Sequence, residues 1–135
     1  MNIQVLQFDE RVGLGTFAPW LTELGCKLRI WRADLLQLPP VGRQDPIILL
    51  GGYMGVNERE RRPYLQSAAV WVAAVVETGQ PLLAICLGGQ LLAHALGAKV
   101  SSQKLQEKGV RDIDLTEAGV VDPLFARLPN PFVSF

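Results

Sequence analysis

One of the two cysteines stands in a context typical of a nucleophile. In "AICLGG", Ala84, Cys86 and Gly88 form the pattern small–x–Cys–x–small, which suits a tight strand-to-helix turn where larger side chains would collide. Such a turn exposes the sulfur and points the backbone N–H of Leu87 towards a bound substrate. The helix expected to start near Gly88 brings its positive end beside the sulfur and favours the thiolate form. We therefore predict that Cys86 is an exposed nucleophile rather than a buried, inert thiol.

A second loop could complete such a site. "GGYMG" follows a continuously apolar segment, and Gly51 and Gly52 would let the backbone turn an N–H inward where a Cβ would obstruct it. The N–H groups of Gly52 and Leu87 would then form a divided oxyanion hole. Gln90, one turn into the helix, could present its amide to a polar substrate. Cys26 lacks a comparable context, and we predict that it packs in the interior.

The elements that must position these residues alternate along the chain. Apolar runs predict strands in residues 3–8, 27–33, 45–50 and 81–86. Helices are expected in residues 16–25 and 63–78 and between Leu87 and Gly97, with Pro63 in a first turn and Gly79 at a stop. Further on, we expect strands in residues 98–102 and 110–116, forming a hairpin-like excursion, and a brief helix in residues 121–128. Strand–helix alternation predicts a three-layer α/β fold, with a mostly parallel twisted sheet between helices and the site at the carboxyl ends of its strands.

Composition narrows the function classes. The 135 residues carry no formal net charge, which argues against nucleic acid or an anionic membrane as the main partner. The longest apolar run, "AAVWVAAVV", has nine residues, far fewer than the ~20 of a membrane span. The amino terminus lacks the pattern of a signal peptide. Two cysteines do not make a disulfide framework, so we expect a reduced, cytoplasmic protein.

Several segments together resemble the class I glutamine amidotransferases. "LLGGYMG" is similar to the family's "GG-x-x-G" loop, and "LAICLGGQLLAHALGAKV" to its "G-x-C-x-G-x-Q" elbow. "EKGVRDIDLTEAG" and "DPLFARLPNPFVSF" resemble the segments that follow. Ala84 replaces a usual glycine, and Tyr53 stands where proline is common.

The resemblance implies a flavodoxin-like fold and glutamine as the small-molecule substrate. Cys86 would attack the side-chain amide, Gly52 and Leu87 would bind the oxyanion, and Gln90 and Gly51 would hold the substrate. A glutamyl thioester would form and release ammonia to an acceptor, and water would then release glutamate. This half-reaction needs no metal or organic cofactor. The implied partner is a synthase or other acceptor protein.

The motif around Cys86 contains no residue that could act as the general base that a thiol nucleophile needs. The one histidine, His94, lies eight residues after Cys86, roughly 12 Å along a helix, so we expect it to be non-catalytic. In the family a histidine and a carboxylate follow a segment similar to "NPFVSF". We therefore expect residues 1–135 to form a single but incomplete domain, truncated at its carboxyl end and inactive alone.

Two alternatives remain open at this level. One is a related elbow-cysteine protein that acts as a small-molecule hydrolase or a redox sensor, although "CLGGQ" favours the amidotransferases. The other is a non-catalytic interaction module or a homo-oligomer, since an open sheet edge invites pairing with another chain.

Overall fold

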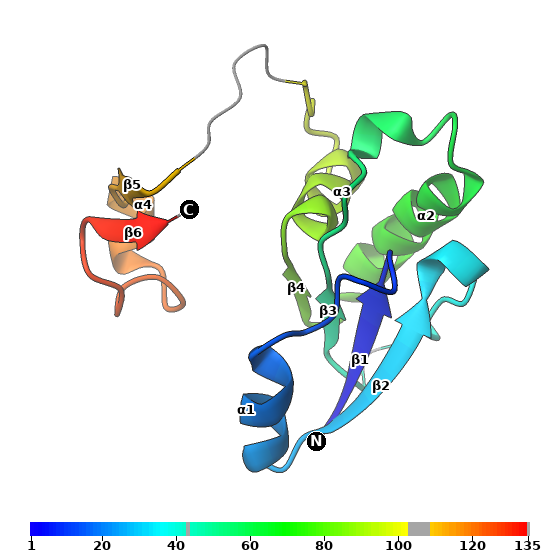
Figure 1. Cartoon of the computed structure of the whole chain (residues 1–135), viewed down its shortest axis with the longest axis horizontal. Coiled ribbons are helices and arrows are strands. Elements are labelled where there is room, and N and C mark those ends of the chain that lie inside the picture. The colour runs from blue at the N-terminus through cyan, green and yellow to red at the C-terminus, as the bar shows by residue number, and fades with distance from the viewer. Residues whose placement is uncertain (43, 103–108, 135) are drawn as a thin grey trace. The chain divides into compact units, whose positions relative to one another are not determined.

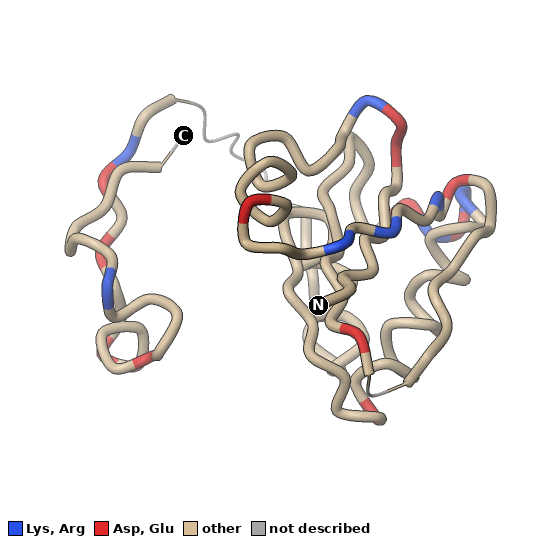
Figure 2. Tube along the Cα trace, turned by 90° about the horizontal axis from the view of Figure 1, so that it is seen from below, with Lys and Arg blue, Asp and Glu red and all other residues tan. Residues whose placement is uncertain are grey.

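The computed structural model describes residues 1–42, 44–102 and 109–134. The chain divides into two compact units, Met1–Ser102 and Gln103–Phe135, and each is described by itself. None of the helices in the described ranges is long and apolar enough to cross a membrane. Acidic and basic residues are interspersed along the trace (Figure 2).

The first unit is built on a four-stranded parallel sheet (Figure 1). Its strands are β1 (Asn2–Gln7), β2 (Lys27–Arg32), β3 (Ile47–Leu49) and β4 (Leu82–Ala84), in the order β2-β1-β3-β4. All pairings in this sheet are parallel, with Leu49 beside Ala84 at the carboxyl ends of β3 and β4. The predicted parallel α/β fold is confirmed.

Helices cover both faces of this sheet. On one face, α3 (Leu87–Ala95) contacts β3 and β4, and α2 (Pro63–Thr78) packs against α3. The buried side chains of both helices share a core with those of Leu6 and Leu49. On the other face, a smaller core around Val5 and Ile48 lies under the short helix α1 (Phe17–Glu23) and the loop before it. Short 3₁₀ turns, η1 (Ala33–Leu35) and η2 (Val56–Glu58), follow β2 and β3 respectively.

The bounds of α2 agree with the prediction because both ends carry strong local signals. Pro63 occupies the first turn, where its missing N–H costs no helical hydrogen bond. Gly79 ends the helix with φ +68°, a left-handed conformation that glycine adopts without a Cβ clash.

The second unit contains a two-stranded antiparallel sheet and one short helix. Strand β5 (Arg111–Ile113) pairs with β6 (Phe132–Ser134), and α4 (Glu117–Val121) lies between them in sequence. The Oγ of Thr116 accepts a hydrogen bond of 3.1 Å from the N–H of Gly119 and caps α4.

Two predictions, one in each unit, are wrong. Residues 98–102 form no strand; the N–H of Ala98 instead bonds the carbonyl of Ala93 and closes the end of α3, and the partner of β5 is β6. Of residues 121–128, Val121 is the last residue of α4, and the rest form turns and bends rather than a helix. The helix begins earlier because Thr116 caps it, and it ends before Pro123, which forces the preceding Asp122 into an extended conformation (ψ 130°).

Candidate active site

Cys86 lies at the junction between β4 and α3 in a strained backbone conformation. Its φ of +54° and ψ of −113° lie outside the regions that L-residues favour, and such conformations cost about 1–3 kcal/mol. Within the described ranges, only Leu36 is another non-glycine residue with positive φ. The Cys86 residue is exposed, and α3 begins at the next residue. The predicted exposed elbow is therefore observed, while the role of the thiol stays a prediction.

Gly88 allows the first turn of α3 to lie directly on β3. A Cβ at this position would lie 2.6 Å from the Cβ of Leu49 and 2.7 Å from its carbonyl oxygen. The Gly88 N–H contacts the carbonyls of Leu50 (3.1 Å) and Ile85 (2.9 Å). The third residue of the small–x–Cys–x–small pattern is thus required by the packing of helix against strand.

The "GGYMG" loop borders the thiol, because β3 and β4 are parallel neighbours and end at the same edge. A Cβ on Gly51 would lie 3.2 Å from the Cβ of Cys86 and 3.7 Å from its Sγ. A Cβ on Gly52 would lie 2.9 Å from Cδ2 of the fully buried Leu87. The structure therefore brings Cys86 together with Gly52 and Leu87, the two predicted oxyanion donors, and with Gly51, which was predicted to hold the substrate.

Cys86, Gly51 and Gly52 line a cavity of about 580 Å³, whereas the Leu87 side chain is fully buried. Three chain segments line it: the loop after β1 together with the first residue of α1, the end of β3 with its glycine loop, and the elbow. The first segment was not predicted from the sequence. It contributes the lining residues Arg11, Val12, Gly13, Leu14, Gly15 and Phe17.

Arg11 is held at this cavity by two neighbours. Its Nε lies 2.9 Å from Oδ1 of Asp9 and its Nη2 lies 2.8 Å from Oδ2, and its guanidinium carbon lies 4.9 Å from the ring centroid of Tyr53. Hydrogen bonds from the side chain and backbone N–H of Arg11 hold the pKa of Asp9 well below its usual range. The same pairing with Asp9 raises the pKa of Arg11 above its ordinary value. The spacing Asp-x-Arg directly after the first strand permits the local pairing of Asp9 with Arg11, but it does not indicate that Arg11 lines this cavity.

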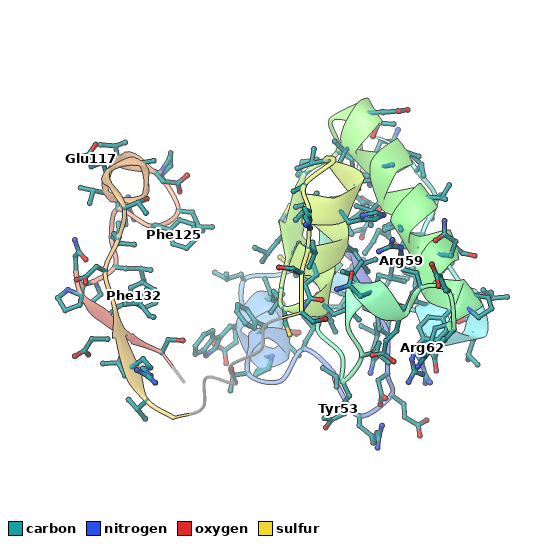
Figure 3. All side chains as sticks on the ribbon, turned by 90° about the horizontal axis from the view of Figure 1, so that it is seen from above. Tyr53, Arg59, Arg62, Glu117, Phe125 and Phe132 are labelled. Carbon is teal, nitrogen blue, oxygen red and sulfur yellow. The ribbon has the colours of Figure 1, made fainter. Side chains whose placement is uncertain are left out.

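Gln90 does not line the cavity. Its Oε1 accepts a hydrogen bond of 3.1 Å from the N–H of Val56, so it joins α3 to η2. The adjacent Gly55 N–H donates to Glu58 Oε1 (2.8 Å), and the other carboxylate oxygen accepts from Arg62 Nε (2.9 Å). Figure 3 shows Arg62 and Arg59 in this region. The predicted substrate role of Gln90 stays a prediction.

The remaining candidates lie apart from this cavity. His94 is half-buried in the last turn of α3 and is not among the lining residues. Cys26 is partly buried against the core around Val5 and Ile48, which confirms the packing prediction. In the part of the chain that the structure describes, no group of three or more His, Cys, Asp or Glu residues is placed to hold a metal ion.

Comparisons with known proteins agree with this arrangement. Residues 18–135 match the family model of the class-I glutamine amidotransferases. The chain is 29% identical over 137 residues to the glutamine amidotransferase-like protein YfeJ of Salmonella typhimurium, covering 97% of this chain and 57% of YfeJ. It is 41% identical over 102 residues to a GMP synthase (glutamine-hydrolyzing) of Thermomicrobium roseum, covering 76% of this chain and 16% of the synthase.

A solved structure gives the same result for the fold. The crystal structure of a glutamine amidotransferase from Thermotoga maritima matches with a TM-score of 0.88 at 25% identity, covering 100% of this chain and 59% of that protein. The chain thus spans less than two thirds of the length of YfeJ and of this structural neighbour.

Proposed function

The chain belongs to the class I glutamine amidotransferase family, and on that premise we propose that it carries the nucleophile half of a glutamine-hydrolysing site. The observation that supports this most directly is an exposed thiol at a strained elbow beside a glycine loop and a 580 Å³ cavity. Cys86 would attack the side-chain amide carbon of glutamine. The thioester would form as ammonia leaves, and water would then release glutamate and restore the thiol.

The surrounding residues would stabilise this reaction through the backbone. The N–H groups of Gly52 and Leu87 would donate to the oxyanion that develops on the amide oxygen, a contribution worth about 2.7–4 kcal/mol per donor in known enzymes. Gly51 would leave room for the substrate, because any side chain there would approach the sulfur. Gln90 would hold the substrate through its Nε2 while its Oε1 stays on Val56.

We propose that the general base is supplied by residues outside these 135. The sequence has one histidine, and that residue, His94, lies on α3 away from the cavity lining. A thiol without a paired base acylates slowly, since both proton removal and protonation of the leaving ammonia need such a group. The chain alone is therefore expected to show negligible glutaminase activity.

The acceptor of ammonia would be a synthase domain or subunit. A relative named GMP synthase (glutamine-hydrolyzing) is 41% identical over 102 residues, which favours an acceptor protein over release of ammonia to solvent.

Labelling and activity assays test these proposals separately. The chain is treated with the chloroketone analogue of L-glutamine, and the extent of modification at Cys86 and Cys26 is followed by peptide mass spectrometry. We expect Cys86 to react much faster than Cys26; equal slow rates would contradict the nucleophile assignment. Glutamate release at a rate comparable with that of intact relatives would contradict the missing base.

A further inference from the structure

The cavity beside Cys86 carries a fixed positive group that the proposed reaction has not used. Arg11 lines the cavity together with Cys86, Gly51 and Tyr53. It lies in the loop that precedes α1, far along the chain from the elbow at Cys86. Its side chain is 68% exposed, whereas that of its partner Asp9 is 15% exposed, so the carboxylate anchors the base of the pair and the guanidinium reaches outward.

The pairing leaves part of the guanidinium available. An arginine has five N–H donors in a planar fork, and Asp9 takes one from Nε and one from Nη2. The bonds found among the described residues use no other donor of this group. The 4.9 Å contact with the Tyr53 ring fixes the plane of the fork from another direction. Arg11 is therefore oriented and still able to bind a second carboxylate.

We propose that Arg11 binds the α-carboxylate of the amino acid whose side-chain amide Cys86 attacks, with Asp9 and Tyr53 as positioning residues. This inference rests on the proposed glutamine-hydrolysing function. A planar carboxylate matches the fork of a guanidinium, and in glutamine the carboxylate lies at the far end of the molecule from the amide. A substrate with its amide at the sulfur would extend across the cavity with its carboxylate towards Arg11.

Arg11 would recognise the α-carboxylate through direct hydrogen bonds rather than through a long-range electrostatic field. Arg11 is paired with Asp9 at 2.8 Å, and the neighbouring Arg32 is itself paired with Asp34 at 2.6 Å. The preference for a substrate with a free carboxylate should therefore depend on contact between Arg11 and that carboxylate, and it should change little when distant charges are altered. If Arg11 only joined the loop after β1 to the loop after β3 through its contact with Tyr53, the site would show no preference for a carboxylate.

The loop around Arg11 has several hydrogen bonds that do not use the Arg11 side chain. The backbone N–H of Arg11 donates to Asp9 Oδ1 (2.9 Å), and that of Val12 donates to the Asp9 carbonyl (3.0 Å). The Nε2 of Gln7 also bonds the carbonyls of Asp9 and Glu10. Arg11→Gln retains all of these bonds.

The test compares two reagents at Cys86: the chloroketone analogue of L-glutamine and its methyl ester, which lacks the negative charge. In both, the sulfur displaces chloride and the thiol proton passes to solvent. The ratio of the two labelling rates at Cys86 measures preference for the carboxylate, whatever the absolute rate. Arg11→Gln is expected to lower this ratio by about fivefold, the effect of an exposed ion pair, and Arg11→Lys to keep part of it.

Arg29→Gln serves as the matched control. Arg29 also stacks on an aromatic ring, 4.4 Å from the centroid of Trp31, but does not line the cavity, so the ratio should not change. An unchanged ratio in Arg11→Gln, or an equal fall in Arg29→Gln, would overturn the proposal. Either result is distinct from failure of the proposed function, which shows as equal labelling of Cys86 and Cys26.

Discussion

The side-chain oxygen of Gln90 accepts the backbone N–H of Val56 at 3.1 Å. This bond joins α3, which begins at the elbow, to η2, which follows the glycine loop. The two segments that flank the thiol are therefore held to each other by a side-chain hydrogen bond.

Removing this bond should loosen the turn without unfolding the sheet. Gln90→Ala is expected to cost about 1 kcal/mol and to speed hydrogen exchange at the Val56 amide. Gln90→Glu keeps an acceptor oxygen and should preserve protection of that amide. If Gln90→Glu keeps the protection but loses labelling by the glutamine chloroketone, Gln90 also contacts substrate; unaltered exchange in Gln90→Ala would refute the positioning role.

Gly88 and Gly89 offer a matched pair of substitutions in one helical turn. Gly88→Ala would place a Cβ 2.6 Å from the Leu49 side chain and 2.7 Å from its carbonyl oxygen, an overlap with backbone expected to cost about 1–3 kcal/mol. At Gly89 the nearest atom, the Ala84 oxygen, is 3.8 Å away, so Gly89→Ala should stabilise by up to ~1 kcal/mol through helix propensity. Urea denaturation measures both, and equal effects would contradict the packing described for the elbow.

The strain at Cys86 predicts that removing the Cβ of this residue stabilises the protein relative to a variant that keeps it. Glycine adopts positive φ without a Cβ penalty, so Cys86→Gly should be more stable than Cys86→Ala by about 1 kcal/mol. The alanine variant retains the strained Cβ and is the reference for loss of sulfur. Equal free energies of unfolding for the two variants would show that the conformation is not strained.

The loop around Glu58 should contribute to acid sensitivity. Hydrogen bonds from the Gly55 N–H and from Arg62 lower the pKa of Glu58 in the folded state, so the unfolded chain binds the proton first on acidification. The stabilisation is therefore full above the unfolded pKa of about 4.3 and is lost as pH falls through the folded pKa. Glu58→Gln should lose less stability than the parent between about pH 5 and about pH 3, measured by urea midpoints. Glu60→Gln, at an exposed position in the same loop, is the control and should follow the parent; if Glu58→Gln does so too, the assigned cause is wrong.

The sequence predicted the features that depend on local rules. Pro63 and Gly79 define α2 because each satisfies a backbone requirement at its own position. The elbow was predictable for the same reason, since residues 84, 86 and 88 must be compatible with one tight turn. Parallel neighbours then place both loops at one edge, so Gly51 and Cys86 were expected to meet.

Features that depend on distant pairing were not predictable. Strand β5 pairs with β6 rather than with residues 98–102, and nothing in its own sequence selects that partner. Arg11 and Tyr53 meet because the loops after β1 and β3 converge across the cavity, and the spacing of either residue along the chain does not show this. The position of α4 was missed for a different reason: the Thr116 cap is a local signal, and the prediction from the apolar residues of 121–128 did not take it into account.

The backbone torsions of residue 86 have a chemical consequence. They fix the direction in which the Cα–Cβ bond leaves the backbone. A hydroxyl or a selenol at this position would approach a bound carbonyl along the same line as the sulfur. The backbone at residue 86 sets the direction of attack, and the choice of oxygen, sulfur or selenium as the reacting atom determines how fast the bond forms.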